Sequence, residues 1–323
     1  MSDLLKNIDA RTKLAGTNKL EILLFSLGSD ARTGRQETFG INVFKVREVM
    51  RTPPITAAPE MPASVEGMVS LRGALVPVVD LARYARVDTQ TPRSIMIVTE
   101  YAGHTQGFLV EAVDTILRLD WSQMRVPPAM LLAELGGLVT AVTELPDGRL
   151  VMLMDVEKIL SETTRYDDEI VYRNIKSLDN PELTVFFADD SAVARKQIER
   201  TLDAMGVKHV AAINGREAWN ELEKVAASAQ TAGQQVSELI SLVLTDIEMP
   251  EMDGYILTKK IKSDPRFAGV PVIMHSSLSG MSNQQLGKSV GVDEYVPKFE
   301  PQRLSETLTR RLLGGLPAVQ LSA

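Results

Sequence analysis

The sequence contains no cysteine and only three histidines in its 323 residues. The lack of cysteine excludes disulfide bonds, iron–sulfur clusters and thiol catalysis, and it is consistent with a reducing compartment. No apolar run approaches the roughly 20 residues that a membrane-spanning helix needs. The amino terminus also lacks a basic segment leading into a long apolar core, so we expect no signal peptide. These absences favour a cytoplasmic protein that is not inserted into a membrane.

Positive charge is scarce as well. The formal net charge is −7, the pI is near 5.2, and no basic run offsets this acidity, so we expect no nucleic-acid-binding surface. Hydrophobic residues make up 44% and charged residues 24% of the chain, which is typical of water-soluble globular proteins. The length of the chain suggests two domains of ordinary size.

Three strand-like segments in the second half of the chain are followed by charged side chains. The segments are 183–188, 239–244 and 294–296. The first two have the length and composition of buried parallel strands. Asp189 and Asp190 come directly after the first, Asp246 follows the second, and Lys298 lies just past the third. If these strands are neighbours in a parallel sheet, the four side chains meet at its carboxyl edge, where such sheets place their ligands.

Three carboxylates placed that close repel one another and need a cation nearby to stay ionised. Oxygen ligands without histidine or cysteine suit a hard ion, and a shallow site that keeps several waters suits Mg²⁺. A neighbouring lysine offers a point charge for one more anion, most simply a phosphoryl group. The sequence therefore predicts a site for Mg²⁺ and phosphate.

Segment 181–313 resembles a receiver domain of two-component signalling. The residues that carry the resemblance occur in the order typical of that family: Asp189-Asp190, Asp246 within D-x-x-M-P-x-M-D-G, Ser276, Tyr295 and Lys298. Such an ordered set is far more specific than a single motif. The resemblance implies a flavodoxin-like α/β domain with a five-stranded parallel sheet.

The same resemblance implies a role for each acidic residue. Asp246 would accept a phosphoryl group. Asp190 and Asp246 would bind Mg²⁺ directly, Asp189 mostly through water, and the backbone carbonyl of Glu248 would add a ligand.

Three further residues would serve the phosphoryl group by resemblance. Ser276 would hydrogen-bond its oxygens, Lys298 would pair with them, and Tyr295 would be the aromatic switch. One departure from the family pattern is that Phe299, rather than proline, follows the lysine. Because the proline is missing, the resemblance does not carry the family's usual cis peptide bond over to this position.

The first half of the chain has the pattern of many short strands without long alternating helices. We expect strands at 20–27, 39–46, 65–79 (two pieces joined at Arg72-Gly73), 94–99, 106–113, 138–143 and 150–154. This pattern favours barrels or a sandwich. The carboxylates of this half are scattered, and its one histidine, His104, is expected on the surface, so no catalytic constellation is predicted here.

Arg72 stands out because it lies within an apolar stretch and needs a partner there. One interpretation is a hairpin-anchoring arginine paired with a carboxylate such as Asp80, and the other is a binding role. The sequence leaves both open.

The stretch around Arg72 resembles the CheW-like coupling domain of bacterial chemotaxis. That family shows G-x-x-x-L-R-G followed by an apolar run and P-x-x-D-L, matched here by Gly67, Leu71, Arg72, Gly73, Pro77, Asp80 and Leu81. The resemblance implies two small five-stranded barrels with a hydrophobic groove that docks on receptors and on the regulatory domain of the kinase CheA. We take Leu71, Arg72, Gly73 and Asp80 as candidate coupling residues. Ser70 stands where the family commonly has asparagine. The resemblance therefore supports the fold more strongly than it supports the receptor contacts at this position.

The predicted organisation is a lead-in (1–18), a CheW-like domain (19–162), a linker (163–180), a receiver domain (181–313) and a tail (314–323). Val171, Ile175 and Leu178 fall at helical spacing in the linker. The linker is therefore either a helix packed on one domain or a solvated segment with a few apolar residues. The sequence does not favour one of these.

A coupling domain followed by a receiver is the arrangement of CheV-type proteins. The resemblance implies an adaptor, not a conventional enzyme, that links chemoreceptors to CheA beside or in place of free CheW. It would be recruited to membrane-associated receptor arrays. Its receiver would take a phosphoryl group from CheA phosphohistidine and release it by self-catalysed hydrolysis.

Three alternatives differ from this interpretation. A passive scaffold with a vestigial receiver would keep the same residues without useful phosphotransfer. A Mg²⁺-dependent phosphatase of the haloacid-dehalogenase type would place its nucleophile before the acidic pair, whereas here Asp246 follows it, and Glu248 stands where that family has an acid/base aspartate. A transcriptional regulator would need a DNA-binding domain, and we expect none after residue 313.

Overall fold

The computed structural model describes residues 19–31, 33–57, 59–101, 104–130, 136–163, 172–178, 180, 182–276, 287 and 289–314. The chain divides into two compact units, residues 1–165 and 166–323, each of which is described by itself. The division falls within the predicted linker. Within the described residues, no helix has the length and apolar content needed to span a membrane.

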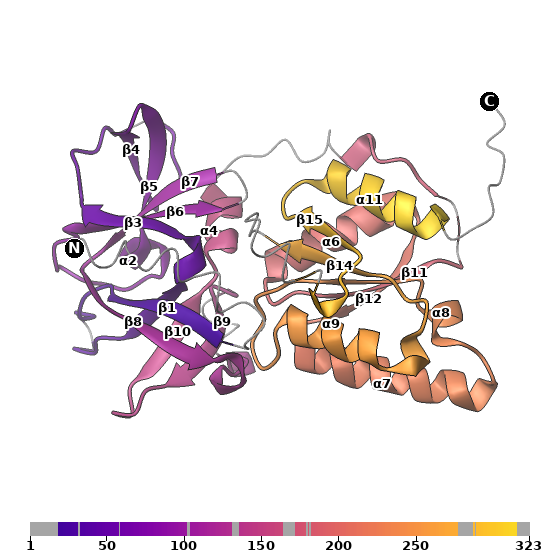
Figure 1. The fold of residues 1–323 in the computed structure, drawn as a ribbon. Helices are drawn as coiled ribbons and strands as arrows, with labels where there is room; N and C mark the ends of the chain where they lie inside the picture. The colour runs from indigo at the N-terminus through magenta and orange to yellow at the C-terminus, as the bar shows by residue number, and fades with distance from the viewer. Residues whose placement is uncertain are drawn as a thin grey trace. The chain divides into compact units, whose positions relative to one another are not determined.

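The first unit is built from two five-stranded sheets, and the prediction of an all-β domain is confirmed. One sheet has the order β8-β1-β2-β10-β9, formed by β1 (Lys19–Ser26), β2 (Thr38–Asn42), β8 (Ala112–Asp120), β9 (Val139–Glu144) and β10 (Leu150–Met154). The other has the order β3-β6-β7-β5-β4, formed by β3 (Val46–Arg51), β4 (Val65–Leu71), β5 (Ala74–Asp80), β6 (Ile95–Tyr101) and β7 (His104–Val110). Each sheet contains one parallel pair, β10–β2 and β5–β7, among antiparallel ones. Figure 1 shows the two sheets one above the other.

Short helices connect these strands. They are η2 (Val43–Lys45), α2 (Leu81–Tyr84), η3 (Trp121–Gln123) and α4 (Val156–Thr163). The predicted strand 39–46 is interrupted by the first of them. The side chain of Asn42 accepts a hydrogen bond from the backbone N–H of Phe44 at 2.9 Å, and this cap turns the chain out of the sheet.

Strands such as β1 and β6 are apolar on both faces because the two faces belong to different cores. In β6, Met96 and Val98 pack in a cluster belonging to their own sheet, whereas Ile97 packs in a large cluster shared by both sheets. In β1, Ile22 and Leu23 divide in the same way between the core of the first sheet and the shared cluster. Alternate residues thus build three apolar clusters, one for each sheet and one between them.

A two-residue turn joins β4 to β5, as predicted. Leu71 pairs with Ala74, and the residues between them, Arg72 and Gly73, have φ of 51° and 85°. Two successive positive φ values match the twist of a tight hairpin, and glycine at the second position adopts this conformation without strain. The turn places the Arg72 side chain at the tip of the hairpin, where it is 66% exposed.

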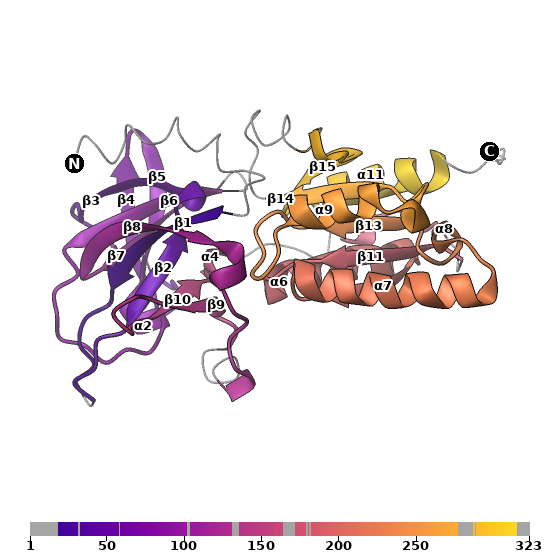
Figure 2. The ribbon, with the colours of Figure 1, turned by 60° about the horizontal axis from the view of Figure 1, so that its bottom comes forward.

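The second unit is an α/β domain with a parallel sheet of order β12-β11-β13-β14-β15, which confirms the predicted fold class. Its strands are β11 (Thr184–Ala188), β12 (Lys208–Ala212), β13 (Leu242–Thr245), β14 (Val272–Ser276) and β15 (Glu294–Pro297). Helices α6 (Ala192–Met205) and α11 (Pro301–Gly314) cover one face; α7 (Gly215–Ala232), α8 (Val236–Leu239), α9 (Gly254–Ser263) and η4 (Pro265–Phe267) cover the other. Figures 1 and 2 show the sheet between these two layers.

Strands β11 and β13 are neighbours at the centre of this sheet, so their carboxyl ends lie side by side. After β11 the chain enters α6 through Ser191, whose hydroxyl accepts a hydrogen bond from the Ala194 N–H at 3.3 Å. The helix ends at Gly206 with φ of 67°.

The alanine-rich stretch 225–233 contains few large apolar side chains. It is the regular second half of α7, which ends only at Gly233 with φ of 68°. Ala226 and Ala229 are buried in the apolar cluster of the α7 face. Small side chains let this part of the helix pack closely, so the low apolar volume of the stretch does not indicate a loop.

The predicted linker contributes to the core of the second unit. Ile175 is buried in the cluster beneath α6 and α11, Leu178 packs against it, and the Leu178 N–H donates to the Met205 carbonyl at 2.8 Å. The Arg200 guanidinium lies 4.1 Å from the centre of the Tyr172 ring. Residues 172–178 are therefore packed on the receiver and are not a solvated linker, whereas Val171 lies outside the described residues. The residue at which the receiver domain begins, 181 or an earlier one, stays a proposal.

Candidate functional site

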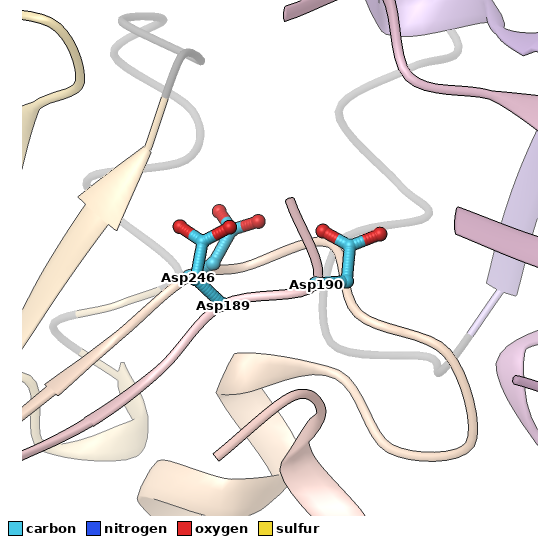
Figure 3. A group of neighbouring side chains, drawn as sticks. All are labelled: Asp189, Asp190 and Asp246. Atoms are coloured by element: carbon cyan, nitrogen blue, oxygen red, sulfur yellow. The ribbon is translucent and has the colours of Figure 1, made fainter. Parts of the chain in front are cut away.

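Three carboxylates meet at the carboxyl edge of the parallel sheet. Asp189 and Asp190 follow β11 and Asp246 follows β13, and their ligand atoms lie within 4.8 Å of one another. In Figure 3 the three side chains extend to the same side of the loops that carry them. Asp189 and Asp246 are buried, with 0% and 4% of their surface exposed, and Asp190 is half-buried. The structure thus brings together the three aspartates that the sequence singled out.

Backbone hydrogen bonds hold the two buried carboxylates in place. The Asp246 N–H donates to the Ala188 carbonyl at 2.8 Å, which ties the end of β13 to the end of β11. One carboxylate oxygen of each residue accepts from the following loop: Asp246 Oδ1 from the Ile247 N–H at 2.7 Å, and Asp189 Oδ1 from the Ser191 N–H at 3.0 Å. These bonds fix the rotamers and leave the other oxygens for partners across the site.

Lys298 bridges the two buried aspartates. Its Nζ lies 2.8 Å from Asp189 Oδ2 and 3.1 Å from Asp246 Oδ2, and the residue is only 2% exposed. The lysine reaches this position because β15 pairs with β14, and its N–H then donates to the Ser276 carbonyl at 3.1 Å. A buried ammonium between two buried carboxylates is a strongly coupled arrangement, because each charge depends on the others for compensation.

The donor set fits a magnesium ion. Three carboxylates lie beside one ammonium, and such a cluster of acidic oxygens suits a divalent cation. The ligand atoms are all oxygen, the site contains no cysteine or histidine, and the partial exposure of Asp190 leaves room for water ligands. Asp190 and Asp246 are the residues that would hold such an ion, with Asp189 beside them. Glu248, whose carbonyl was predicted as a ligand, lies two residues beyond Asp246 in the same loop and is half-buried.

The loop after β13 closes tightly on the Asp246 backbone. The Gly254 N–H donates to the Ile247 carbonyl at 2.9 Å, and a Cβ atom at Gly254 would lie 1.9 Å from the Asp246 carbonyl oxygen. Only glycine fits there, which gives a physical reason for the glycine of the D-x-x-M-P-x-M-D-G motif. Asp253 caps the following helix α9 by accepting from the Ile256 N–H at 2.7 Å.

The two predicted switch residues lie on neighbouring strands. Ser276 is the buried last residue of β14, and Tyr295 lies on β15. The Tyr295 ring is turned inward: its hydroxyl is hydrogen-bonded to the Tyr255 hydroxyl at 3.2 Å, and a Cβ atom at Gly287 would lie 2.4 Å from the ring. Burial raises the pKa of Tyr295 to about 12, and burial likewise raises the pKa of Tyr255, with the charge and hydrogen bond of Tyr295 acting in the same direction.

The departure after Lys298 has a local structural counterpart. No cis peptide bond occurs among the described residues, and Phe299 adopts a left-handed φ of 63°. The chain thus enters α11 through a conformation that is uncommon for residues other than glycine, asparagine and aspartate.

The coupling-domain candidates lie at the β4–β5 hairpin and at the end of β5. Arg72 Nη2 pairs with Glu48 Oε2 at 2.9 Å, so the suggestion of Asp80 as its partner is wrong. Asp80 is buried, pairs with Arg93 Nε at 2.8 Å and caps α2 through the Arg83 N–H. Since β3 and β4 are the two edges of their sheet, the Arg72–Glu48 pair shows that this sheet curls until its edges approach. Leu71 is half-buried, and Gly73 completes the turn.

The histidines do not contribute to the site chemistry. His275 is buried in β14, and His209 contacts Asp203 at 3.1 Å near the surface. His104, which was expected on the surface, begins β7 and is half-buried.

Two residues near the acidic site were missed by sequence reasoning. Arg195 Nη1 donates to the carbonyls of Asp189 and Asp190 at 2.8 and 2.9 Å, and Tyr255 meets Tyr295. A basic residue on the first turn of the helix after an acidic pair could have signalled the first contact. Nothing in the sequence signals the second, because it depends on where the two rings point.

Comparison with known proteins agrees with this architecture. The family model of the CheW-like domain matches residues 21–164, and that of the response regulator receiver domain matches residues 185–309. Chemotaxis protein CheV1 of Helicobacter pylori is 27% identical over 331 residues, which cover 97% of this chain and 99% of the relative. Chemotaxis protein CheY1 of the same organism is 37% identical over 128 residues, covering 39% of this chain and 94% of the relative. Chemotaxis protein CheW of Klebsiella aerogenes is 30% identical over 153 residues, covering 46% and 87%.

The alignment with CheV1 runs through both units, and those with CheW and CheY1 each account for about one half of the chain. The chain therefore belongs to the CheW-like and response regulator receiver families, joined in the order of the CheV-type chemotaxis proteins.

Proposed function

We propose that this CheV-type protein is an adaptor that couples chemoreceptors to the histidine kinase CheA, and that a phosphoryl group on Asp246 regulates the coupling. The observation that carries the proposal is the meeting of Asp189, Asp190, Asp246 and Lys298 at one sheet edge. This arrangement places three carboxylates beside one lysine, which suits a divalent cation and a phosphoryl group together.

The proposed chemistry is a direct phosphoryl transfer. A carboxylate oxygen of Asp246 attacks the phosphorus of a phosphohistidine on CheA, the new O–P bond forms as the P–N bond breaks, and the imidazole leaves. A bound Mg²⁺ would neutralise the charge that spreads over the phosphoryl oxygens. Lys298, which follows β15 and already lies 3.1 Å from Asp246 Oδ2, would pair with the same phosphoryl oxygens. Attack of water on the phosphorus of the acyl phosphate breaks its bond to the Asp246 oxygen, which releases inorganic phosphate and returns the carboxylate.

Ser276 and Tyr295 connect the phosphoryl group to the surface of the receiver. The Ser276 hydroxyl would move toward the phosphoryl group and donate a hydrogen bond to one of its oxygens. This movement would change the space available to the Tyr295 side chain on the adjacent strand. A charge-assisted hydrogen bond contributes about 1.5–3 kcal/mol, enough to shift a balance of two arrangements that differ by a few kcal/mol. In this structure the Tyr295 ring is already turned inward. The observed arrangement is therefore one of the two states of the proposed switch.

The amino-terminal unit supplies the docking surface in this proposal. Leu71, Arg72 and Gly73 form the tip of the β4–β5 hairpin, whereas Asp80 acts below it by holding Arg93 and the start of α2. The partners would be the chemoreceptors and CheA, beside or in place of free CheW, at membrane-associated receptor arrays.

Two other functions are less well supported. A passive scaffold with a vestigial receiver would not need a buried lysine between two buried carboxylates, an arrangement that brings a desolvation penalty and is retained here nonetheless. An aspartate-nucleophile phosphatase is disfavoured because the acidic pair follows β11 and the candidate nucleophile follows β13, the reverse of the order in that class.

Incubation with CheA carrying a radioactive phosphoryl group, in the presence of Mg²⁺, tests the receiver half of the proposal. We expect label on the wild type and none on Asp246→Asn, and slow or no labelling of Asp190→Asn and Lys298→Ala. Glu251→Gln, which removes a carboxylate from the same loop, is the matched control and should label normally. Undiminished labelling of Asp246→Asn would rule out the acceptor assignment.

A fragment of residues 1–165 tests the coupling half. It contains both β-sheets and their three apolar clusters, so it should fold and co-sediment with receptor–kinase complexes. A folded fragment that stays in the supernatant would show that this unit is not the docking module.

A further inference from the structure

Arg195 lies on the first turn of α6, directly behind the acidic pair. The ladder of β11 ends at Ala188, whose carbonyl accepts from the Asp246 N–H, and the Asp189 N–H donates to the Ala212 carbonyl at 3.2 Å. The next two carbonyls of the chain, those of Asp189 and Asp190, lie past the paired part of the strand. Both accept from one guanidinium nitrogen, Arg195 Nη1, at 2.8 and 2.9 Å.

The position of this guanidinium is itself fixed. The Arg195 N–H donates to the Ser191 carbonyl at 3.0 Å, so the residue belongs to the first hydrogen-bonded turn that Ser191 caps. The Ser191 N–H in turn donates to Asp189 Oδ1 at 3.0 Å. The segment 189–191 is thus held from three directions: by the sheet, by the helix cap and by the arginine.

The side chains of Lys298 and Arg195 therefore contact different groups of the acidic site. Lys298 contacts the carboxylate oxygens of Asp189 and Asp246, the groups that react and bind. Arg195 contacts the backbone carbonyls behind them. The carboxylates of Asp189, Asp190 and Asp246 extend to the same side of the loops that carry them, as Figure 3 shows, and their ligand atoms lie within 4.8 Å of one another.

We infer that Arg195 is a positioning residue of the metal site: it holds the backbone of Asp189 and Asp190 so that their carboxylates face Asp246 at the separation a divalent cation needs. The inference rests on the proposed function, since it deepens the assignment of that site. Partners that orient metal ligands from behind typically change metal affinity about 10- to 100-fold when they are removed.

The test measures metal binding directly, using the full-length chain and Mn²⁺ in place of Mg²⁺, with the electron paramagnetic resonance signal of free Mn²⁺ as the readout. We expect Arg195→Gln to raise the Kd for Mn²⁺ about 10- to 100-fold. The matched control is Lys196→Gln, which removes the same charge from the exposed neighbouring position of the helix, and its Kd should stay close to that of the wild type.

A general loss of structure is separated from a loss of positioning by measuring thermal unfolding in EDTA. The positioning role predicts weaker Mn²⁺ binding by protein that is still folded, whereas a merely structural role predicts a lower unfolding temperature with normal binding below it. Should Arg195→Gln not fold, Arg195→Met, which keeps an unbranched side chain in the helix, takes its place. Arg195→Lys keeps a charged donor and should lose less affinity than Arg195→Met.

Three results would overturn the inference: wild-type affinity in the folded Arg195→Gln or Arg195→Met variant, an equal loss in Lys196→Gln, or a lysine variant no better than the methionine variant. An absence of Mn²⁺ and Mg²⁺ binding by the wild type would overturn it as well. If the wild type binds the metal but accepts no phosphoryl group from CheA, the proposed function fails while the role of Arg195 stands, because metal binding is measured without phosphotransfer.

Discussion

The hydroxyls of Tyr295 and Tyr255 are hydrogen-bonded at 3.2 Å, which ties the predicted switch residue to a buried tyrosine on α9. Tyr255 is the second residue of α9, and α9 follows the loop that begins with Asp246. The contact therefore joins β15 to the same loop that carries the proposed phosphoryl acceptor. It also places two hydroxyls where burial opposes their ionisation.

A dependence of stability on alkaline pH follows from this pair. The pKa of Tyr295 is raised to about 12, so the folded receiver keeps the neutral hydroxyl while the unfolded chain ionises near pH 10. The contribution of Tyr295 is fully present below pH 10 and decreases as the pH rises from about 10 to about 12. Urea unfolding should show the wild type losing its advantage over Tyr295→Phe across this range. A difference that does not change between pH 9 and pH 11.5 would contradict the prediction.

The ion pairs of Lys298 predict opposite effects of two substitutions when no metal is bound. Lys298→Met leaves two buried carboxylates without their ammonium, and breaking a buried ion pair in this way typically costs about 3–5 kcal/mol. Asp246→Asn removes one of two adjacent carboxylates and relieves their repulsion, while Lys298 keeps Asp189 as partner. We expect Lys298→Met to lower the free energy of unfolding in EDTA by about 3 kcal/mol and Asp246→Asn to change it little or raise it.

Mg²⁺ should restore part of the stability of Lys298→Met, because the ion replaces the missing positive charge, and should stabilise Asp246→Asn less than the wild type. Thermal unfolding with and without Mg²⁺ measures both effects. Equal unfolding free energies for Lys298→Met and the wild type in EDTA would show that the lysine is not needed to compensate the buried carboxylates.

The sequence predicted that the aspartates after β11 and β13 lie together, because their positions depend on chain order and strand length alone. Parallel strands whose apolar residues end at Ala188 and Thr245 must present the next residues at the same edge, whatever the details of packing. Contacts that depend on side-chain direction were not predicted. Arg195 reaches backwards to the carbonyls of the acidic pair, and Tyr255 meets Tyr295 across two elements.

The partner of Arg72 shows the same limit in the amino-terminal unit. Asp80 was suggested because it is near in sequence and on the adjoining strand, but its carboxylate is buried and occupied by Arg93. The actual partner, Glu48, lies on the opposite edge strand of the sheet. Only the curvature of the sheet brings the two together, and curvature is not apparent from a pattern of alternating residues.

Substitution of Arg72 distinguishes the hairpin-anchoring role from the binding role. The side chain is 66% exposed, so its pair with Glu48 should stabilise the fold by no more than about 1 kcal/mol. Arg72→Ala should therefore leave the free energy of unfolding of the first unit nearly unchanged. If Arg72 serves binding, the same variant weakens co-sedimentation with receptor–kinase complexes at least tenfold.

Arg118→Ala is a suitable control, since it removes another exposed arginine that is paired with a glutamate, Glu21, on the other sheet of the same unit. Arg72→Ala and Arg118→Ala with equal, small effects on co-sedimentation would leave Arg72 with a hairpin role alone.

The segment 172–178 should stabilise the receiver although it precedes the residues matched by the receiver family. Ile175 is 9% exposed and packs in the cluster of α6 and α11, and truncating a buried isoleucine to alanine typically costs 2–5 kcal/mol. Because the residue lies at the margin of the cluster, we expect Ile175→Ala to lower the free energy of unfolding of the receiver by about 2 kcal/mol. Lys176→Ala, at the exposed neighbouring position, should have almost no effect.

Fluorescence of Trp219 follows the unfolding of the receiver alone when Trp121, the other tryptophan, is replaced by phenylalanine in every variant compared. The same comparison with bound Mg²⁺ should show the same loss for Ile175→Ala, since the segment packs beneath the helices and not at the sheet edge that carries the carboxylates. If Ile175→Ala and Lys176→Ala are equally stable, the apolar cluster of α6 and α11 packs without a contribution from segment 172–178. The receiver would then begin after that segment, near residue 181.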